Sequence, residues 1–313
     1  MRTRSRYWFL NVLLVVAAYG YLIYKLVTFD DYAGMAASFR AAGWLEYVCL
    51  LGAVVLMPVN VLCESWKWQV LLRSVAPMSI AEAERQVYFG FVGAFVTTYR
   101  AGDYPSRVLL MHDRSTWVTA IALGLVGTLA MLVVEICLGV PALIAFAQYE
   151  SAMPLKTMLV MSGVIVVLLL LIPVGLRCLM HKEWKNEQLH KMFVALRQLT
   201  YGQFMYVVGI SLARFIVWAL QLALVLYFCG VVLSPMQLLL SVPTYYLLVG
   251  VLPSLPVADM AIRGSVSILV FGAFSQNLAG IAIAVAIIWI INTILPMLVG
   301  SVVQKKYQPV DIH

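Results

Sequence analysis

The feature that most constrains this chain is a series of apolar runs, each close to or above the length needed to cross a lipid bilayer. A spanning helix needs about 20 predominantly apolar residues. Runs of this kind lie at 7–27, 44–73, 116–146, 157–178, 203–228 and 280–303. Charged residues make up 11% of the chain, against roughly 25% in a soluble domain. We therefore expect an all-α polytopic membrane protein with about six spanning helices, forming a single transmembrane domain over residues 1–313.

Two further apolar stretches are broken by charges and helix-breaking residues. The first runs from Gln86 into Thr97-Thr-Tyr-Arg-Ala-Gly-Asp-Tyr-Pro-Ser-Arg107, and the second, at 236–274, contains Pro253, Pro256 and Asp259. Proline disfavours helical geometry at the preceding residue and removes a backbone donor, and Asp259 is suited to cap a second helix that ends near Phe274. Such breaks survive in hydrocarbon only where protein or water satisfies the freed backbone groups. We expect two broken, re-entrant helical hairpins.

The two breaks match each other in spacing. Gly102-Asp103-x-x-x-Arg107 corresponds to Ala258-Asp259-x-x-x-Arg263, and each hairpin lies between two spanning runs. With six spans, the first hairpin enters from the cytoplasm and the second from outside. Paired interrupted segments of this kind are typical of an inverted-topology repeat with a substrate site near the midplane. Repeat one then covers about 44–147 and repeat two about 203–303.

The basic residues indicate the orientation. With both termini in the cytoplasm, the positive-inside rule places most of them there, Lys67 included, and leaves only Lys25, Arg40 and Lys156 outside. The net charge of +7 is thus explained by topology and does not indicate nucleic acid. The polar segment 181–200 carries spaced apolar residues and is expected to form an amphipathic helix on the membrane surface, or a plain solvated helix.

Charged residues at the two breaks are the candidate substrate-binding groups. Arginine suits phosphate because its planar fork makes bidentate contacts, and an inward-pointing helix N-terminus also favours an anion. The alternative is that each Asp pairs with the Arg four residues later as a structural ion pair. The candidates are Arg100, Asp103, Arg107, Asp259 and Arg263.

Two ionisable residues fall within uninterrupted spans. Glu135 and Arg214 are expected to pair with each other, or Glu135 carries a proton that drives transport. Glu64, Gln221 and Asn292 are weaker polar candidates, expected to form interhelical hydrogen bonds.

Enzymatic and metal-dependent functions find little support in the sequence. The four histidines have no metal-ligand spacing, and no Gly-rich phosphate loop or paired-Asp cluster is found. The five cysteines are scattered through apolar segments and are expected to be core filler. We therefore assign no catalytic residue, metal or cofactor.

Three stretches resemble the lysylphosphatidylglycerol synthase transmembrane-region family, the flippase-like integral membrane proteins of bacteria and archaea. They are Glu64-Ser-Trp-Lys-Trp-Gln-Val-Leu-Leu72, Tyr99-Arg-Ala-Gly-Asp-Tyr-Pro-Ser-Arg107 and Leu255-Pro-Val-Ala-Asp-Met-Ala-Ile-Arg-Gly264. The resemblance does not extend to the soluble aminoacyl-transferase domain of the namesake enzymes. It implies lipid translocation, or handling of lipid-linked intermediates, in a bacterial-type cytoplasmic (inner) membrane.

The combined interpretation is a lipid translocase that moves an anionic or phosphate-bearing lipid, such as a phospholipid or a polyprenyl phosphate, between leaflets by alternating access. Its partners would be membrane lipids. The alternative is a membrane-embedded transferase acting on a lipid headgroup, with Asp103 or Asp259 as base. A non-catalytic scaffold is a third possibility, and in that case the central charges would be dispensable.

The topology gives a first prediction. Cysteines introduced at Ser38 and Ser151 should react with a membrane-impermeant thiol reagent in intact cells, because both loops are expected outside. Protection of both positions, with labelling at the N-terminus instead, would contradict this orientation.

Overall fold

The structure is a computed structural model that describes residues 43–97, 100–149, 156, 160, 163, 187–252 and 259–305. These residues form helices joined by short turns, and no strand is found among them. In chain order the elements are α3 (Trp44–Leu72), α4 (Ile80–Val96), α5 (Asp103–Leu109), the 3-10 turn η2 (Arg114–Thr116), α6 (Trp117–Tyr149), α8 (Glu187–Gln198), α9 (Tyr201–Phe228), α10 (Pro235–Val251), α11 (Asp259–Phe271), α12 (Leu278–Trp289), the π turn η3 (Ile290–Ile294) and α13 (Leu295–Lys305).

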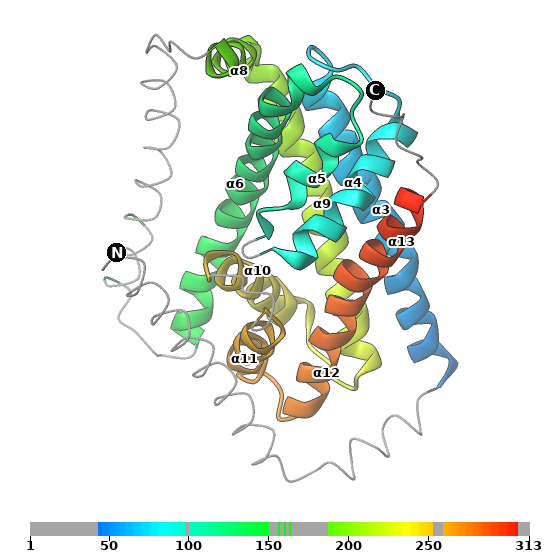
Figure 1. Ribbon diagram of the computed structural model, residues 1–313. Coiled ribbons are helices and arrows are strands. Elements are labelled where there is room, and N and C mark those ends of the chain that lie inside the picture. Colours follow the sequence, from blue (N-terminus) through cyan, green and yellow to red (C-terminus); the bar gives the residue numbers. More distant parts are fainter. Residues whose placement is uncertain are drawn as a thin grey trace, which may run out of the picture.

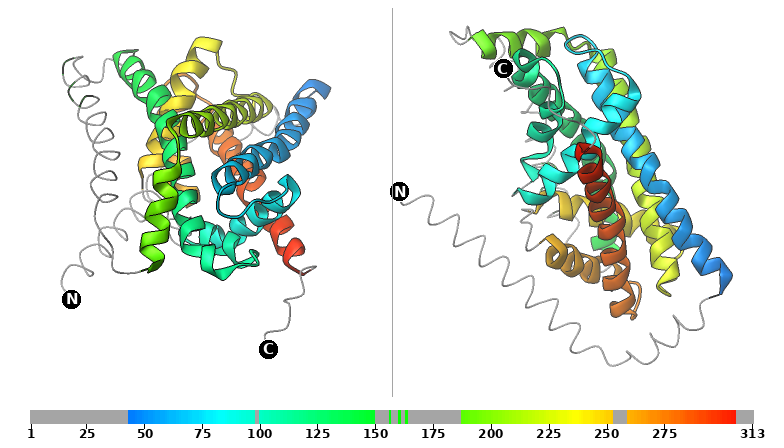
Figure 2. Two further views of the ribbon diagram at one scale, coloured as in Figure 1. Left: turned by 90° about the horizontal axis from the view of Figure 1, so that it is seen from above. Right: turned by 45° about the vertical axis from the view of Figure 1, so that its right-hand side comes forward.

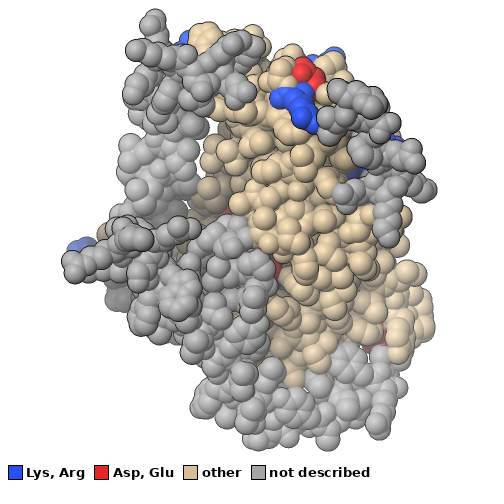
Figure 3. Space-filling view, in the orientation of Figure 1, with Lys and Arg blue, Asp and Glu red and all other residues tan. Residues whose placement is uncertain are grey.

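Four helical segments in the described part of the chain are long and apolar enough to cross a membrane. They are Trp44–Leu72, Arg114–Tyr149, Tyr201–Phe228 and Leu278–Val302. Each agrees with an expected span, and the described residues visible in Figure 3 show few charged side chains, most of them near the upper end. The described part of the chain is therefore all-helical and has the character of a membrane protein. The expected spans 7–27 and 157–178 lie outside the described residues.

Polar side chains fix the starts of several helices. The Ser79 hydroxyl accepts from the Glu82 N–H at the start of α4, and Ser234 does the same for Gln237 at the start of α10. Thr200 and Gln203 form a reciprocal capping box that starts α9. Each cap satisfies a backbone donor that has no partner within its helix, which is worth about 1 kcal/mol. The chain therefore enters these helices at positions that the sequence itself marks.

The two pairs of short helices lie in opposite halves of the bundle. Figure 1 shows α4 and α5 in the upper half, while α10 and α11 lie in the lower half. The long helices α3 and α9 pack side by side along their length (Figure 2, right). Helix α4 packs against α13, and α10 packs against α6. Each short pair is thus enclosed by long helices from both halves of the chain.

Several expected boundaries need adjustment. Helix α11 ends at Phe271, short of the expected Phe274, and the last span is interrupted by the π turn η3. The residues before Asp259 lie outside the described part of the chain, so its expected capping role stays a prediction. A helix within 181–200 is confirmed by α8, whose Phe193 is buried against the rest of the protein. Pro253 and Pro256 lie outside the described residues.

Glycine allows two close helix crossings. A Cβ atom on Gly139 of α6 would lie 2.6 Å from the Leu247 Cβ and 3.0 Å from the Pro243 carbonyl oxygen of α10. A Cβ atom on Gly300 of α13 would overlap the Tyr88 carbonyl of α4. Because backbone atoms cannot move aside as a flexible side chain can, both crossings require glycine.

Adding a methyl group at these crossings should destabilise the protein. We expect Gly139→Ala and Gly300→Ala each to cost about 1–3 kcal/mol through overpacking, which a melting temperature in detergent would detect. Gly209→Ala in α9 is the matched control, because a Cβ atom there meets nothing within 4 Å. The control should be neutral or slightly stabilising, since alanine favours helix. Equal melting temperatures for all three variants would contradict the close crossings.

Candidate functional site

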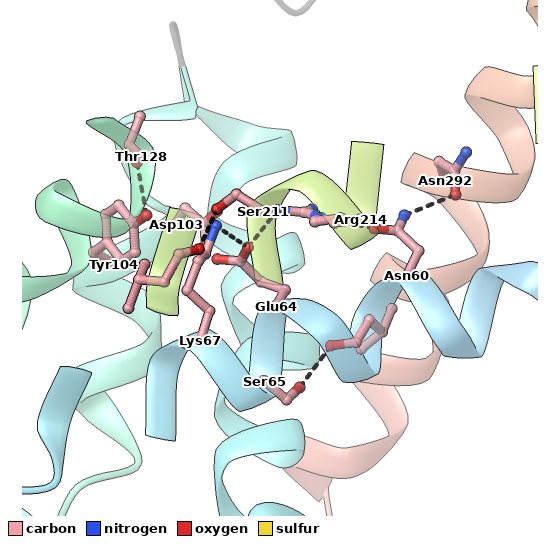
Figure 4. Close-up of polar contacts among 12 residues, drawn as sticks. Asn60, Glu64, Ser65, Lys67, Asp103, Tyr104, Thr128, Ser211, Arg214 and Asn292 are labelled. Atoms are coloured by element: carbon pink, nitrogen blue, oxygen red, sulfur yellow. Dashed lines mark hydrogen bonds and ion pairs between the residues drawn. The ribbon is translucent and has the colours of Figure 1, made fainter. Parts of the chain in front are cut away.

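The buried carboxylate of Glu64 is the centre of the polar interior. Glu64 lies on α3 and is 3% exposed. Its Oε2 atom is 2.8 Å from Lys67 Nζ, one turn further along α3, and its Oε1 atom is 3.0 Å from an Arg107 NH1 atom of α5. Arg214 of α9 donates to Oε2 as well (Figure 4). One carboxylate therefore joins three helices through three cations.

Arg107 is fully engaged by its neighbours. Its Nε atom donates to Asp103 Oδ1 at 2.7 Å, which is the pairing across four residues that the alternative interpretation of this motif predicts. The guanidinium carbon lies 5.2 Å and 4.7 Å from the ring centroids of Trp68 and Tyr104. With a side-chain exposure of only 2%, Arg107 is a structural cation in this arrangement.

A chain of amide side chains continues the network across the bundle. Arg214 Nε donates to Asn60 Oδ1 at 2.7 Å, and Asn60 Nδ2 donates to Asn292 Oδ1 at 3.1 Å. Asn292 lies in the π turn η3, and its Nδ2 donates to Gln221 Oε1 at 3.0 Å. Gln221 in turn donates to the Ala53 carbonyl at 2.8 Å. The expected interhelical hydrogen bonds of Glu64, Gln221 and Asn292 are confirmed.

The expected pair between Glu135 and Arg214 is wrong. Arg214 bonds to Glu64 and Asn60 instead, because α9 packs along α3 and brings these groups within reach. Glu135 forms no hydrogen bond or ion pair within the described residues. The expectation that Lys67 faces the cytoplasm is also wrong. Its side chain is buried, with 3% of its surface exposed, and is paired with Glu64. The sequence signal for Lys67 was its spacing of three residues from Glu64 on one helix face.

The first break is held by backbone contacts and one hydroxyl. Thr97 Oγ1 donates to the Gly93 carbonyl at 2.7 Å and accepts from the Gly102 N–H at 2.7 Å. A Cβ atom on Gly93 would overlap both Ser106 and the Gly102 carbonyl, so α4 and α5 meet backbone to backbone. Between them, Arg100 has φ +55°, in the left-handed region that residues other than glycine seldom adopt. Its guanidinium carbon lies 5.5 Å from the Phe91 ring centroid.

The second break carries a looser ion pair. Arg263 Nε donates to both oxygens of Asp259, at 3.1 Å and 3.0 Å, and Trp289 Nε1 of α12 donates to Asp259 Oδ2 at 2.9 Å. The Arg263 side chain is 24% exposed, against 2% for Arg107. The two matched arginines therefore differ. Arg107 is buried and paired with Glu64 and Asp103, while Arg263 remains partly accessible to solvent.

A small cavity lies between the two breaks. It has a volume of about 30 Å³ and receives residues from both short helix pairs and from the last span. Its lining residues are Ala94, Phe95, Thr97, Arg100, Asp259, Trp289 and Thr293. Since about 10–15 Å³ of such space holds one water molecule, the cavity admits water or a small polar group. Of the predicted site residues, the structure thus brings Arg100 and Asp259 to one cavity, while Asp103 and Arg107 belong to the Glu64 network.

Within the described ranges, no group of histidine, cysteine, aspartate and glutamate side chains is arranged to hold a metal ion. A scan against protein-family models found no match for this chain, and a search of curated proteins found no similar protein.

The network gives a prediction that separates the two possible partners of Arg214. In double-mutant cycles on thermal stability, Glu64→Gln and Arg214→Gln should be strongly coupled, because the two side chains form a direct buried ion pair and removing one partner of such a pair costs up to about 3–5 kcal/mol. Glu135→Gln and Arg214→Gln should show weaker coupling. Glu46→Gln, at the open start of α3, is the control and should cost at most about 1 kcal/mol. Stronger coupling of Arg214 to Glu135 than to Glu64 would contradict the network.

Proposed function

We propose that this protein is a translocase that moves an anionic or phosphate-bearing lipid between the leaflets of a membrane. In this proposal α4–α5 and α10–α11 are re-entrant hairpins of an inverted-topology repeat, and access to the headgroup site alternates between the two sides. The observation that carries the proposal is the shared cavity, where Arg100 from the first break meets Asp259 from the second. A site formed jointly by two interrupted segments is typical of transporters built from inverted repeats.

Matched positions in the two halves support the repeat. Three features of α4 recur in α10 at the same distance along the sequence. They are the serine that caps the start of the helix, the carbonyl that touches a crossing glycine, and the residue that follows the end of the helix. The pairs are Ser79 with Ser234, Tyr88 with Pro243, and Thr97 with Leu252. The Asp–Arg pairs of the two breaks are displaced by one further residue.

The helix contacts support it as well. Helix α4 packs on the last span of the second half, and α10 packs on the last span of the first half. The glycines at these crossings, Gly139 and Gly300, lie equally far from the starts of α6 and α12. A two-fold rotation that places each half on the other would therefore place the α4–α13 contact on the α10–α6 contact. An inverted repeat, whose two-fold axis lies in the membrane plane, requires this correspondence.

Arg100 and Arg263 are the residues we assign to the headgroup. Arg100 lines the cavity and retains an unfavourable backbone conformation, of the kind that costs about 1–3 kcal/mol and gathers at functional sites. Arg263 is partly exposed beside Asp259. Both could offer bidentate contacts to a phosphate. Arg107, by contrast, is assigned to the structural network.

The transferase alternative is less well supported. Its candidate bases, Asp103 and Asp259, each accept hydrogen bonds from the arginine four residues later, and a neighbouring cation makes a carboxylate a weaker base. The motif resemblance to flippase-like membrane proteins also favours translocation. A transferase would turn over substrate in detergent, whereas a translocase needs two leaflets.

The test is translocation of fluorescently labelled phosphatidylglycerol in proteoliposomes, measured together with the melting temperature. Arg100→Ala and Arg263→Ala should slow translocation by about tenfold or more with little loss of stability, because each removes charge-assisted hydrogen bonds worth about 1.5–3 kcal/mol. Arg263→Lys should be intermediate, since it keeps the charge but loses the fork.

Two arginine variants serve as controls. Arg107→Ala should lower the melting temperature, because it leaves Glu64 and Asp103 without their shared cation. Arg85→Ala, on the exposed face of α4, should change neither quantity. Normal translocation by folded Arg100→Ala and Arg263→Ala proteins would exclude the headgroup site.

A further inference from the structure

Glu135 is an interior carboxylate whose charge no described neighbour pairs directly. It lies in α6 within the span Arg114–Tyr149 and is only partly exposed. Glu64, a second carboxylate in the middle of a span, is held by three cations, whereas no hydrogen bond or ion pair involves Glu135 among the described residues. An ionised carboxylate in hydrocarbon is costly, so acidic residues kept there mark ion pathways or proton relays.

The position of Glu135 connects it to the second break. A Cβ atom on Gly250 of α10 would lie 2.9 Å from Glu135 Oε2, so the carboxylate rests against the backbone just before that break. Among the described residues, the charged and titratable groups that interact electrostatically with it are Lys67 from α3, Arg214 from α9, Tyr246 from α10 and Arg263 from α11. Helix α5 meets α6 nearer its start, at Gly124 and Thr128. Helix α8 lies across the upper end of the bundle (Figure 1).

The interior charges leave a positive excess that an anion can balance. The described cations inside the bundle are Lys67, Arg100, Arg107, Arg214 and Arg263. The described carboxylates there are Glu64, Asp103, Glu135 and Asp259. Five cations against four carboxylates give a net charge of +1 when Glu135 is ionised, and +2 when it is protonated. Protonation of Glu135 therefore doubles the net positive charge of these described interior groups, Arg100 and Asp259 of the cavity included.

We propose that Glu135 is a proton-binding site coupled to the headgroup site, so that one proton is carried with each anionic lipid. This inference rests on the proposed translocase function and adds its coupling ion. The neutral carboxyl group strengthens the attraction of the interior for an anion, and a bound anion in turn favours the proton. Such coupling is reciprocal, and it typically changes affinity by about 5- to 150-fold.

The proton site can be tested without any lipid. Dicyclohexylcarbodiimide reacts with protonated carboxyl groups in apolar surroundings, and the modified residue is identified by mass spectrometry. We expect Glu135 to be modified increasingly as the pH falls. Glu64 is the control within the same molecule, because three cations hold it ionised. Absence of modification at Glu135, or equal modification of Glu64, would overturn the proton site.

Coupling is tested by binding of short-chain phosphatidylglycerol, whose phosphodiester keeps one negative charge over this pH range. Wild-type protein should bind it about tenfold more tightly at mildly acidic than at mildly alkaline pH. Glu135→Gln mimics the protonated form, so it should bind tightly at both values, and its translocation should no longer respond to an imposed proton gradient. Glu135→Asp should keep the pH dependence, and so should the control Glu46→Gln.

The outcomes separate this inference from the proposed function. If Glu135→Gln keeps the wild-type pH dependence of binding or the response to the gradient, the coupling is wrong while translocation stands. If wild-type protein neither binds nor moves phosphatidylglycerol at any pH, the lipid assignment is wrong, and the modification experiment still decides whether Glu135 binds a proton.

Discussion

The structure depends on the desolvated charge of Glu64. A carboxylate without a partner in this position would be far too costly, and the three cations around it would each be equally costly alone. Together they fix the positions of α3, α5 and α9, because Lys67, Arg107 and Arg214 come from these helices. The amide chain through Asn60 and Asn292 extends this connection to the last span. The polar interior thus specifies which helices are neighbours, a choice that apolar side chains in lipid leave open.

Under the proposed repeat, the two halves of the bundle use corresponding helix positions for different purposes. In the first half, Gly90 leaves room for Arg107 and Asp103 to lie against α4, and Arg107 then reaches Glu64 on α3. At the matched position of the second half stands Tyr245, a buried ring packed against Phe271. Gln221 of α9 bonds to amide and carbonyl groups, whereas Glu64 of α3 bonds to cations. Arg263 bonds to Asp259 within its own helix and remains partly exposed.

Much of the helix order follows from the sequence, because run length, caps and proline act locally. Trp44–Leu72 and Tyr201–Phe228 agree with the predicted runs to within a few residues. Partner choice inside the bundle does not follow, since it depends on which helices touch. Glu135 and Arg214 were the most conspicuous charges within spans, yet Arg214 bonds to Glu64, which the family-like motif Glu64-Ser-Trp-Lys contains. The left-handed conformation of Arg100 and the π turn at Asn292 have no local sequence signal that we could identify.

The glycine crossings have a mechanical consequence. At Gly139 and Gly300 backbone atoms of two helices come close together, so the glycine itself adds no interlocking side chain that would resist small sliding there. The α3–α9 contact is different, because buried hydrogen-bonded side chains resist displacement. Bending of the bundle should therefore preserve the α3–α9 contact and occur mainly at the crossings of Gly139 and Gly300. Each hairpin would then swing with the opposite half of the molecule, and the cavity between the breaks is the place where that swing changes the spacing most.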